Sequence, residues 1–178
     1  TENEEEATSL DITLHDSVMD TDLVLTYSVY EDYPVVTRSA RLVQKGNQKI
    51  RLENVMSAAV EFPDMDYEMI HLSGAWARER YVKTRKLEMG IQAVQSLAGT
   101  GSSSEQNPFI ALKRPHTTED TGEVFGFSFV YSGNFLAQVE VSTYEMTRVM
   151  MGINPQGFSW ELSKDEEFQA PEVVMVYS

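Results

Sequence analysis

Short stretches of alternating apolar and polar residues run through most of this chain, separated by turn residues about every ten positions. Leu10, Ile12 and Leu14 alternate with polar neighbours, and residues 23–30 repeat the pattern. Successive side chains of a β-strand point to opposite faces, so this alternation predicts half-buried strands. Strands of this kind bury their apolar faces by stacking as sheets, and the pattern therefore predicts an antiparallel β-protein.

Further strands are expected wherever the same pattern returns between turn signals such as Gly46-Asn47 and Ser132-Gly133-Asn134. Residues 1–9 are acidic and are expected to be a frayed start. About a dozen short strands without a convincing amphipathic helix predict a large antiparallel β-sandwich, forming a single domain over residues 10–178. Beyond the two strands above, the expected strands are 35–43, 50–62, 124–131, 135–141, 143–151, 158–162 and 172–177.

Charge and composition exclude several kinds of partner. A net charge of −14 argues against nucleic acid and against anionic membranes, because both are polyanions. The absence of cysteine removes disulfides and thiolate sites and fits a reducing cytoplasm, which is where we expect the protein. No apolar run approaches the roughly 18 residues of a membrane helix, and no signal-peptide pattern opens the chain.

Sequence patterns of known catalytic and metal sites are not found. The histidines (His15, His71 and His116) are far apart in sequence, so no metal site and no cofactor is predicted. A glycosidase needs two nearby carboxylates, but the candidate pairs are interpreted as exposed loop acids. Those pairs are Asp64 with Asp66 and Glu119 with Asp120. No catalytic residue is assigned.

Trp76 is the residue that points to a ligand. It follows Gly74-Ala75 and precedes a charged segment, Arg78-Glu79-Arg80. Small residues before a ring permit close backbone approach, and charges after it suggest a surface position. An exposed aromatic ring can stack on the apolar C–H face of a sugar, whereas a tryptophan in the core serves packing. From the residues alone, both interpretations stay open.

Several motifs, in the same order along the chain, closely resemble bacterial α-galactosidases of glycoside hydrolase family 36. The most specific is His-Leu-Ser-Gly-Ala-Trp-Ala-Arg-Glu-Arg at residues 71–80. The others are Asn-Pro-Phe at 107–109 and the segments at 118–128, 131–135, 152–155, 158–160 and 168–174.

The resemblance implies a multidomain enzyme with an amino-terminal β-supersandwich, a central (β/α)₈ barrel and a small carboxy-terminal β-domain. This chain matches most of the supersandwich, truncated at its N-terminal side, which is expected to leave a sheet edge unpaired. The implied reaction is retaining hydrolysis of terminal α-linked galactose from raffinose- or melibiose-type oligosaccharides. Its two catalytic aspartates lie on the barrel, so this chain alone is expected to be inactive.

The resemblance also implies a role for single residues and partners. Trp76 matches a substrate-contacting tryptophan, while Arg78 and Glu79 are candidates for an interface ion pair or the pocket rim. The implied partners are the α-galactoside substrate, the catalytic barrel and further copies in a homotetramer. One loop departs from the family, because Ser103-Ser104-Glu105 stand where relatives commonly have Ser-His-Gln.

The ends of the chain and two other functions complete the hypotheses. Thr1 opens an acidic run without an initiator methionine, and residues 171–177 look like a strand cut at its end, so we expect a fragment of a longer protein. One alternative is an autonomous carbohydrate-binding module that binds sugar alone. The other is a pure assembly scaffold, which predicts that Trp76 is buried in the core.

Overall fold

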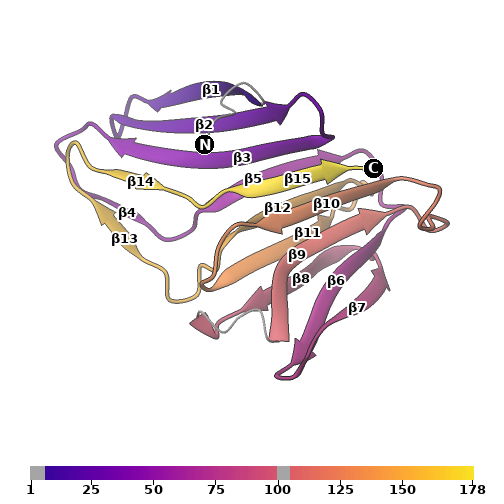
Figure 1. The fold of residues 1–178 in the computed structure, drawn as a ribbon. Coiled ribbons are helices and arrows are strands. Elements are labelled where there is room, and N and C mark those ends of the chain that lie inside the picture. Colours follow the sequence, from indigo (N-terminus) through magenta and orange to yellow (C-terminus); the bar gives the residue numbers. More distant parts are fainter. Residues whose placement is uncertain (1–6, 100–104) are drawn as a thin grey trace.

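Fifteen β-strands make up the computed structural model, which describes residues 7–99 and 105–178 (Figure 1). No helix in these two ranges has the length and apolar character that crossing a membrane requires. The strands are β1 (Ala7–Asp16), β2 (Thr21–Tyr30), β3 (Val35–Gln44), β4 (Ile50–Leu52), β5 (Met56–Phe62), β6 (Glu68–Ala75), β7 (Arg78–Lys86), β8 (Gly90–Ser96), β9 (Gln106–Lys113), β10 (Val124–Phe129), β11 (Phe135–Val141), β12 (Thr147–Ile153), β13 (Trp160–Leu162), β14 (Glu167–Gln169) and β15 (Val173–Tyr177).

The strands form two stacked sheets and a short ribbon. The larger sheet has nine strands, in the order β1-β2-β3-β15-β10-β9-β6-β7 with β14 also paired to β3. A four-stranded sheet, β5-β12-β11-β8, packs against it through contacts of β5 with β3 and of β8 and β11 with β9. The pairings between these strands are antiparallel, so the prediction of an all-β antiparallel sandwich is confirmed.

The main core lies between the two sheets. In β11 every second residue, from Phe135 to Val141, is buried, and these side chains meet Phe127 and Phe129 of β10. Burying each of the larger side chains among them, the phenylalanines and valines, contributes about 1.5–3 kcal/mol. A smaller second core forms where the β4–β13 ribbon closes over β3. It contains Ala40, Leu52, Val55, Leu162 and Ala170.

Several expected strand boundaries are wrong. Residues 50–62 form two strands in different sheets, because β4 pairs with β13 and β5 pairs with β12. The strand expected at 143–151 begins only at Thr147, since residues 142–146 make the turn after β11. β10 ends at Phe129, and β1 begins at Ala7, inside the segment expected to be frayed.

β1 is a strand, but the expectation that it is half-buried is wrong. All ten of its residues are exposed, including Leu10, Ile12 and Leu14. The alternation of apolar and polar side chains correctly predicted a strand. Burial of its apolar side chains also needs a second layer of structure opposite the strand. The four-stranded sheet ends at β5, which lies across from β3, so in the described part of the chain it does not reach β1.

Candidate functional site

Trp76 stands at the tip of the hairpin formed by β6 and β7, which projects from one end of the large sheet (Figure 1). Its side chain is 87% exposed, which is high for the largest aromatic residue. The assembly-scaffold alternative predicted a buried Trp76, and this expectation is wrong. The ring is therefore free to contact something outside these residues.

The backbone of the tip holds this position through close local packing. Ala75 pairs with Arg78, so Trp76 and Ala77 form the turn, and Ala77 adopts a left-handed conformation with φ of 64°. A Cβ on Gly74 would lie 2.3 Å from the backbone oxygen of Arg78, so only glycine fits there without a shift. The fold of the turn thus requires the glycine of the Gly-Ala-Trp motif.

Glu79 has a local role that its sequence position did not reveal. Its carboxylate oxygen Oε1 accepts a hydrogen bond from the backbone N–H of Ala77 at 2.9 Å. This contact satisfies a donor in the strained turn residue next to Trp76. Arg78 is exposed at the start of β7. The structure therefore gives Glu79 a function in shaping the tip, while the interface role of both residues stays a prediction.

His71, a residue of β6, connects the two strands of the hairpin. Its side chain is buried, and Nε2 lies 2.8 Å from Nη2 of Arg85 on β7. A guanidinium only donates hydrogen bonds, so Nε2 accepts and the ring proton is on Nδ1. Burial, followed by the nearby Arg85 charge, lowers the pKa of His71, although the Gln106 side chain acts in the opposite direction. His71 is thus a neutral histidine that connects β6 to β7, a role that its position in the sequence did not reveal.

The cations around Trp76 lie on an exposed strand. All nine residues of β7 are exposed, and the strand is an edge of the sheet. Lysine and arginine on such an edge discourage pairing with other chains. Of the Ser103-Ser104-Glu105 loop, the two serines lie outside the described residues.

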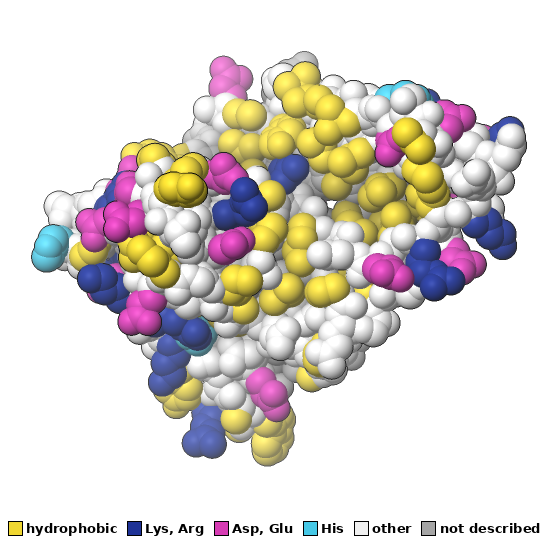
Figure 2. All heavy atoms as spheres, turned by 180° about the vertical axis from the view of Figure 1, so that it is seen from behind, with side chains coloured by type: hydrophobic (Ala, Val, Ile, Leu, Met, Phe, Trp, Pro, Cys, Tyr) yellow, Lys and Arg dark blue, Asp and Glu magenta, His cyan; other side chains and the backbone are white. Residues whose placement is uncertain are grey.

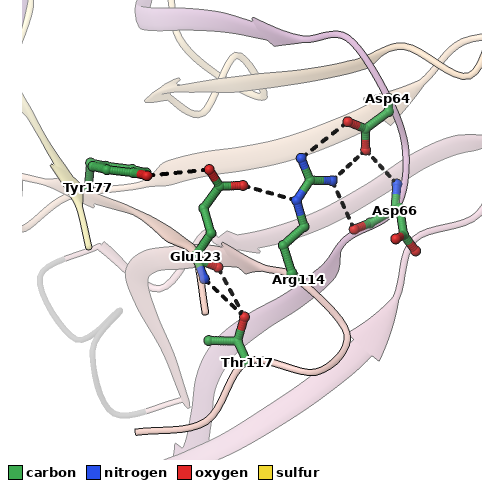
Figure 3. Close-up of polar contacts among 6 residues, drawn as sticks. All are labelled: Asp64, Asp66, Arg114, Thr117, Glu123 and Tyr177. Atoms are coloured by element: carbon green, nitrogen blue, oxygen red, sulfur yellow. Dashed lines mark hydrogen bonds and ion pairs between the residues drawn. The ribbon is translucent and has the colours of Figure 1, made fainter. Parts of the chain in front are cut away.

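Acidic side chains are brought together at another place, around Arg114 (Figure 3). Arg114 Nη1 lies 2.6 Å from Asp64 Oδ1, and its Nε lies 3.0 Å from Glu123 Oε2. The hydrogen bonds from Arg114 lower the pKa of Asp64, which keeps this carboxyl ionised. Because Arg114 forms ion pairs with both carboxylates, this cluster has the properties of a structural clamp.

The carboxylates considered from sequence have different surroundings. Asp66, Glu119 and Asp120 are exposed, as expected. Asp64 lies in the loop between β5 and β6 with its side chain 42% exposed, and Arg114, fifty positions away, binds it. Within residues 7–99 and 105–178 no group of three or more His, Asp or Glu side chains is arranged to hold a metal ion.

Comparison with known proteins identifies relatives over the whole chain. The model of the glycosyl hydrolase family 36 N-terminal domain matches residues 1–163. Alpha-galactosidase AgaA of Geobacillus stearothermophilus is 52% identical over 99% of this chain, and alpha-galactosidase 1 of Pediococcus pentosaceus is 42% identical over 99%. This chain spans about a quarter of their length, 24% of each.

Solved structures agree with the sequence relatives. The crystal structure of AgaA matches with a TM-score of 0.97 and 51% identity, covering 100% of this chain and 25% of that one. The alpha-galactosidase of Lactobacillus brevis matches with a TM-score of 0.96 and 38% identity, covering 99% of this chain and 24% of that one. An AgaA variant has been solved in complex with raffinose and another with stachyose. The fold and these matches together show that the chain belongs to glycosyl hydrolase family 36, as its N-terminal domain.

Proposed function

We propose that this chain is the non-catalytic domain of an α-galactosidase, in which Trp76 forms part of the wall of the substrate pocket. The observation that carries the proposal is the 87% exposure of Trp76 on a tip whose backbone is fixed by Gly74 and Glu79. The relatives are α-galactosidases, and two AgaA complexes contain the α-galactosides raffinose and stachyose. An exposed ring whose position is fixed in this way can stack on one face of a galactosyl unit.

The physical role of Trp76 in such a pocket is positioning. An indole ring that covers the apolar face of the terminal sugar removes water from it and restricts its orientation. The hydrolysis itself, with retention, is assigned to the two aspartates of a barrel outside these residues. In this proposal the domain also forms contacts between the subunits of a homotetramer. The enzyme is proposed to be cytoplasmic.

The test is Trp76→Ala in the full-length enzyme, with kinetics on raffinose. We expect kcat/KM to fall about tenfold or more, equivalent to roughly 1.4 kcal/mol of lost transition-state stabilisation. Trp160→Ala is the matched control, because this other tryptophan is 50% exposed on β13, away from the hairpin. Unchanged kcat/KM in Trp76→Ala would show that the ring does not contact the substrate.

The autonomous carbohydrate-binding module makes a different prediction. If the domain binds sugar alone, calorimetric titration of the 178-residue chain with galactose gives a dissociation constant in the millimolar range or below. If the pocket is completed by other domains, as we propose, the titration gives no heat of binding.

A further inference from the structure

Tyr144 is almost as exposed as Trp76, 86% against 87%. It lies in the turn between β11 and β12, where the hydroxyl oxygen of Ser142 accepts hydrogen bonds from the backbone N–H groups of Tyr144 and Met146, both at 3.2 Å. Glu145 completes the turn with a left-handed φ of 61°, and its N–H donates to the carbonyl of Ser142 at 3.0 Å. Tyr144 is therefore an exposed aromatic residue on a turn whose backbone is fixed.

A row of charged side chains crosses the four-stranded sheet next to this turn. Glu140 of β11 lies opposite Arg148 of β12, and Arg148 lies opposite Glu61 of β5. Cross-strand partners project to the same side of a sheet. That side is the outer one, because Val141, the neighbour of Glu140 along β11, is buried in the core between the sheets. The three charged residues form what we call the outer charged row.

A hollow of about 240 Å³ lies between the turn and the outer charged row. The row, Tyr144 and Met146 are among the groups that line it, so its wall is partly aromatic and partly charged. Figure 2 shows a surface of this mixed kind in the left half of its view, where acidic and basic side chains lie beside hydrophobic ones. Pockets for drug-sized ligands measure about 300–1,000 Å³. The hollow is smaller, which suits a single ring-sized unit.

The polar groups of the hollow have hydrogen-bonding capacity that the described residues leave unused. Arg148 binds Glu61 through Nε, at 2.9 Å, and through Nη2. A guanidinium has five N–H donors, and within residues 7–99 and 105–178 the two on Nη1 of Arg148 make no hydrogen bond. In the same ranges the carboxylate of Glu140 accepts none. The hollow therefore offers both donors and acceptors to a ligand.

These groups define the chemistry of a ligand that would fit. It must donate to Glu140 and accept from Arg148, and hydroxyl groups can do both. It also needs an apolar face for the Tyr144 ring. An anion is disfavoured, because the row has two carboxylates for one guanidinium and the whole chain has a net charge of −14. A neutral pyranose ring meets these conditions, since it has hydroxyl groups at its edge and C–H groups on its face.

We propose that this hollow is a surface binding site for one neutral pyranose unit of a polysaccharide chain. The Tyr144 ring stacks on the C–H face of the sugar, while Glu140 and Arg148 bind its hydroxyl groups. The two carboxylates and the guanidinium bind the sugar without cleaving it, so the site holds a carbohydrate chain at the surface of the enzyme.

The hollow is separate from the tip that carries Trp76. The hydroxyl of Thr147, at the end of the turn, donates to the backbone oxygen of Asp64 at 2.8 Å, which places the turn near the start of β6. β6 then runs for eight residues, roughly 25 Å, before the chain reaches Trp76. A sugar in the hollow and a sugar at Trp76 therefore occupy different places.

The experiment is affinity electrophoresis of the full-length protein in native gels that contain guar galactomannan, a neutral polysaccharide. 1-Deoxygalactonojirimycin, which is bound in a structure of an AgaA variant, is added at a saturating concentration to fill the catalytic pocket and prevent cleavage. We expect the polysaccharide to retard the wild type. Tyr144→Ala should bind at least about fivefold more weakly, because the stacked ring is lost.

Two further variants control for the ring and for its exposure. Tyr144→Phe keeps an aromatic ring and should be retarded like the wild type. Tyr33→Ala removes another tyrosine, 62% exposed between β2 and β3, and should also be retarded like the wild type. The proposal would be overturned by a wild type that the polysaccharide does not retard, by equal retardation of Tyr144→Ala and the wild type, or by a Tyr144→Phe variant as weak as Tyr144→Ala.

The same gels separate this proposal from the one for Trp76. With the inhibitor at saturation for each variant, Trp76→Ala should be retarded like the wild type, whether or not Trp76 contacts the substrate. If Trp76→Ala loses the retardation and Tyr144→Ala keeps it, the polysaccharide binds at the catalytic pocket and the hollow is not a binding site.

Discussion

The guanidinium carbon of Arg114 lies 4.0 Å from the centre of the Tyr67 ring. The same guanidinium binds Asp64 and Glu123, which belong to the segments after β5 and before β10. Tyr67 is 2% exposed, so the cation covers the end of the aromatic core. A single side chain thus joins the β5–β6 and β9–β10 loops at one end of the sandwich, and Tyr177 of β15 approaches Glu123 at 3.5 Å (Figure 3).

Arg114→Gln should destabilise the domain by about 2 kcal/mol, because it leaves two carboxylates without their cation and removes the stacking on Tyr67. The check is urea unfolding at pH 7, followed by tryptophan fluorescence. Arg51→Gln is the control, because its ion pair with Glu161 joins side chains that are 60% and 56% exposed. Such a pair contributes less than about 1 kcal/mol. Equal effects of the two substitutions would show that the Arg114 cluster is no stronger than a surface pair.

Acidification should weaken the domain through His71. Its pKa is lowered in the folded state, so the unfolded chain binds a proton first, at its ordinary pKa of about 6.5. The stabilisation is complete above that pH and is lost as the pH falls below it, with a slope of at most about 1.4 kcal/mol per pH unit. Unfolding free energies measured between pH 7.5 and 5.5 test this. Asp64 has a lowered pKa, so its contribution is lost only at lower pH, near and below about 4.

His71→Gln should flatten this pH dependence, because glutamine has no titrating proton. The control is His116→Gln, which replaces an exposed histidine with the same amide side chain. A slope that persists in His71→Gln would assign the effect to another group.

Substitutions of Glu79 test whether the conformation of the hairpin tip affects activity. Glu79→Gln keeps a side-chain oxygen that accepts from Ala77, whereas Glu79→Ala removes it. In the full-length enzyme we expect kcat/KM on raffinose to fall about threefold to tenfold for the alanine variant, since a lost hydrogen bond costs about 1 kcal/mol. The glutamine variant should stay near the wild type. If kcat/KM falls equally in both variants, the negative charge of Glu79 is needed for activity. An ion pair with another subunit or domain would then explain the role of Glu79 better than the bond to Ala77.

Gly74→Ala should displace Trp76 without unfolding the domain. The added methyl would lie 2.3 Å from a backbone oxygen at the tip, so the turn must shift, but no core residue is involved. We expect kcat/KM to fall nearly as far as in Trp76→Ala, with a Tm within a few degrees of the wild type. Gly126→Ala is the control, because the nearest atoms are 3.8 Å from the methyl position. Full activity of Gly74→Ala would contradict a positioned ring.

Local sequence patterns predicted most of the strands, because side-chain alternation is a property of each segment. Residues 35–43 and 135–141 became β3 and β11 almost unchanged. One failure occurred where the chain changed direction without a strong turn signal. Residues 53–55 separate β4 from β5 although no glycine or proline marks the break.

The candidate site was predicted in part. The Gly-Ala-Trp motif identified Trp76, but the same residues also allowed a core position for its ring. Glu79 was considered only for an interface, since its bond to Ala77 depends on the shape of a turn. His71 and Arg85 are fourteen positions apart and meet only because β6 and β7 pair.

The sequence by itself determined that this chain forms antiparallel β-strands, and its motifs determined the family. Those features depend on the period of the side chains and on the residues at each position. The tertiary structure decided which faces are covered. It left β1 exposed although its pattern matches that of buried strands, it exposed Trp76, and it joined Asp64 to Arg114. Burial and ion pairing depend on which segments lie opposite one another, and that is set by contacts between residues far apart in the chain.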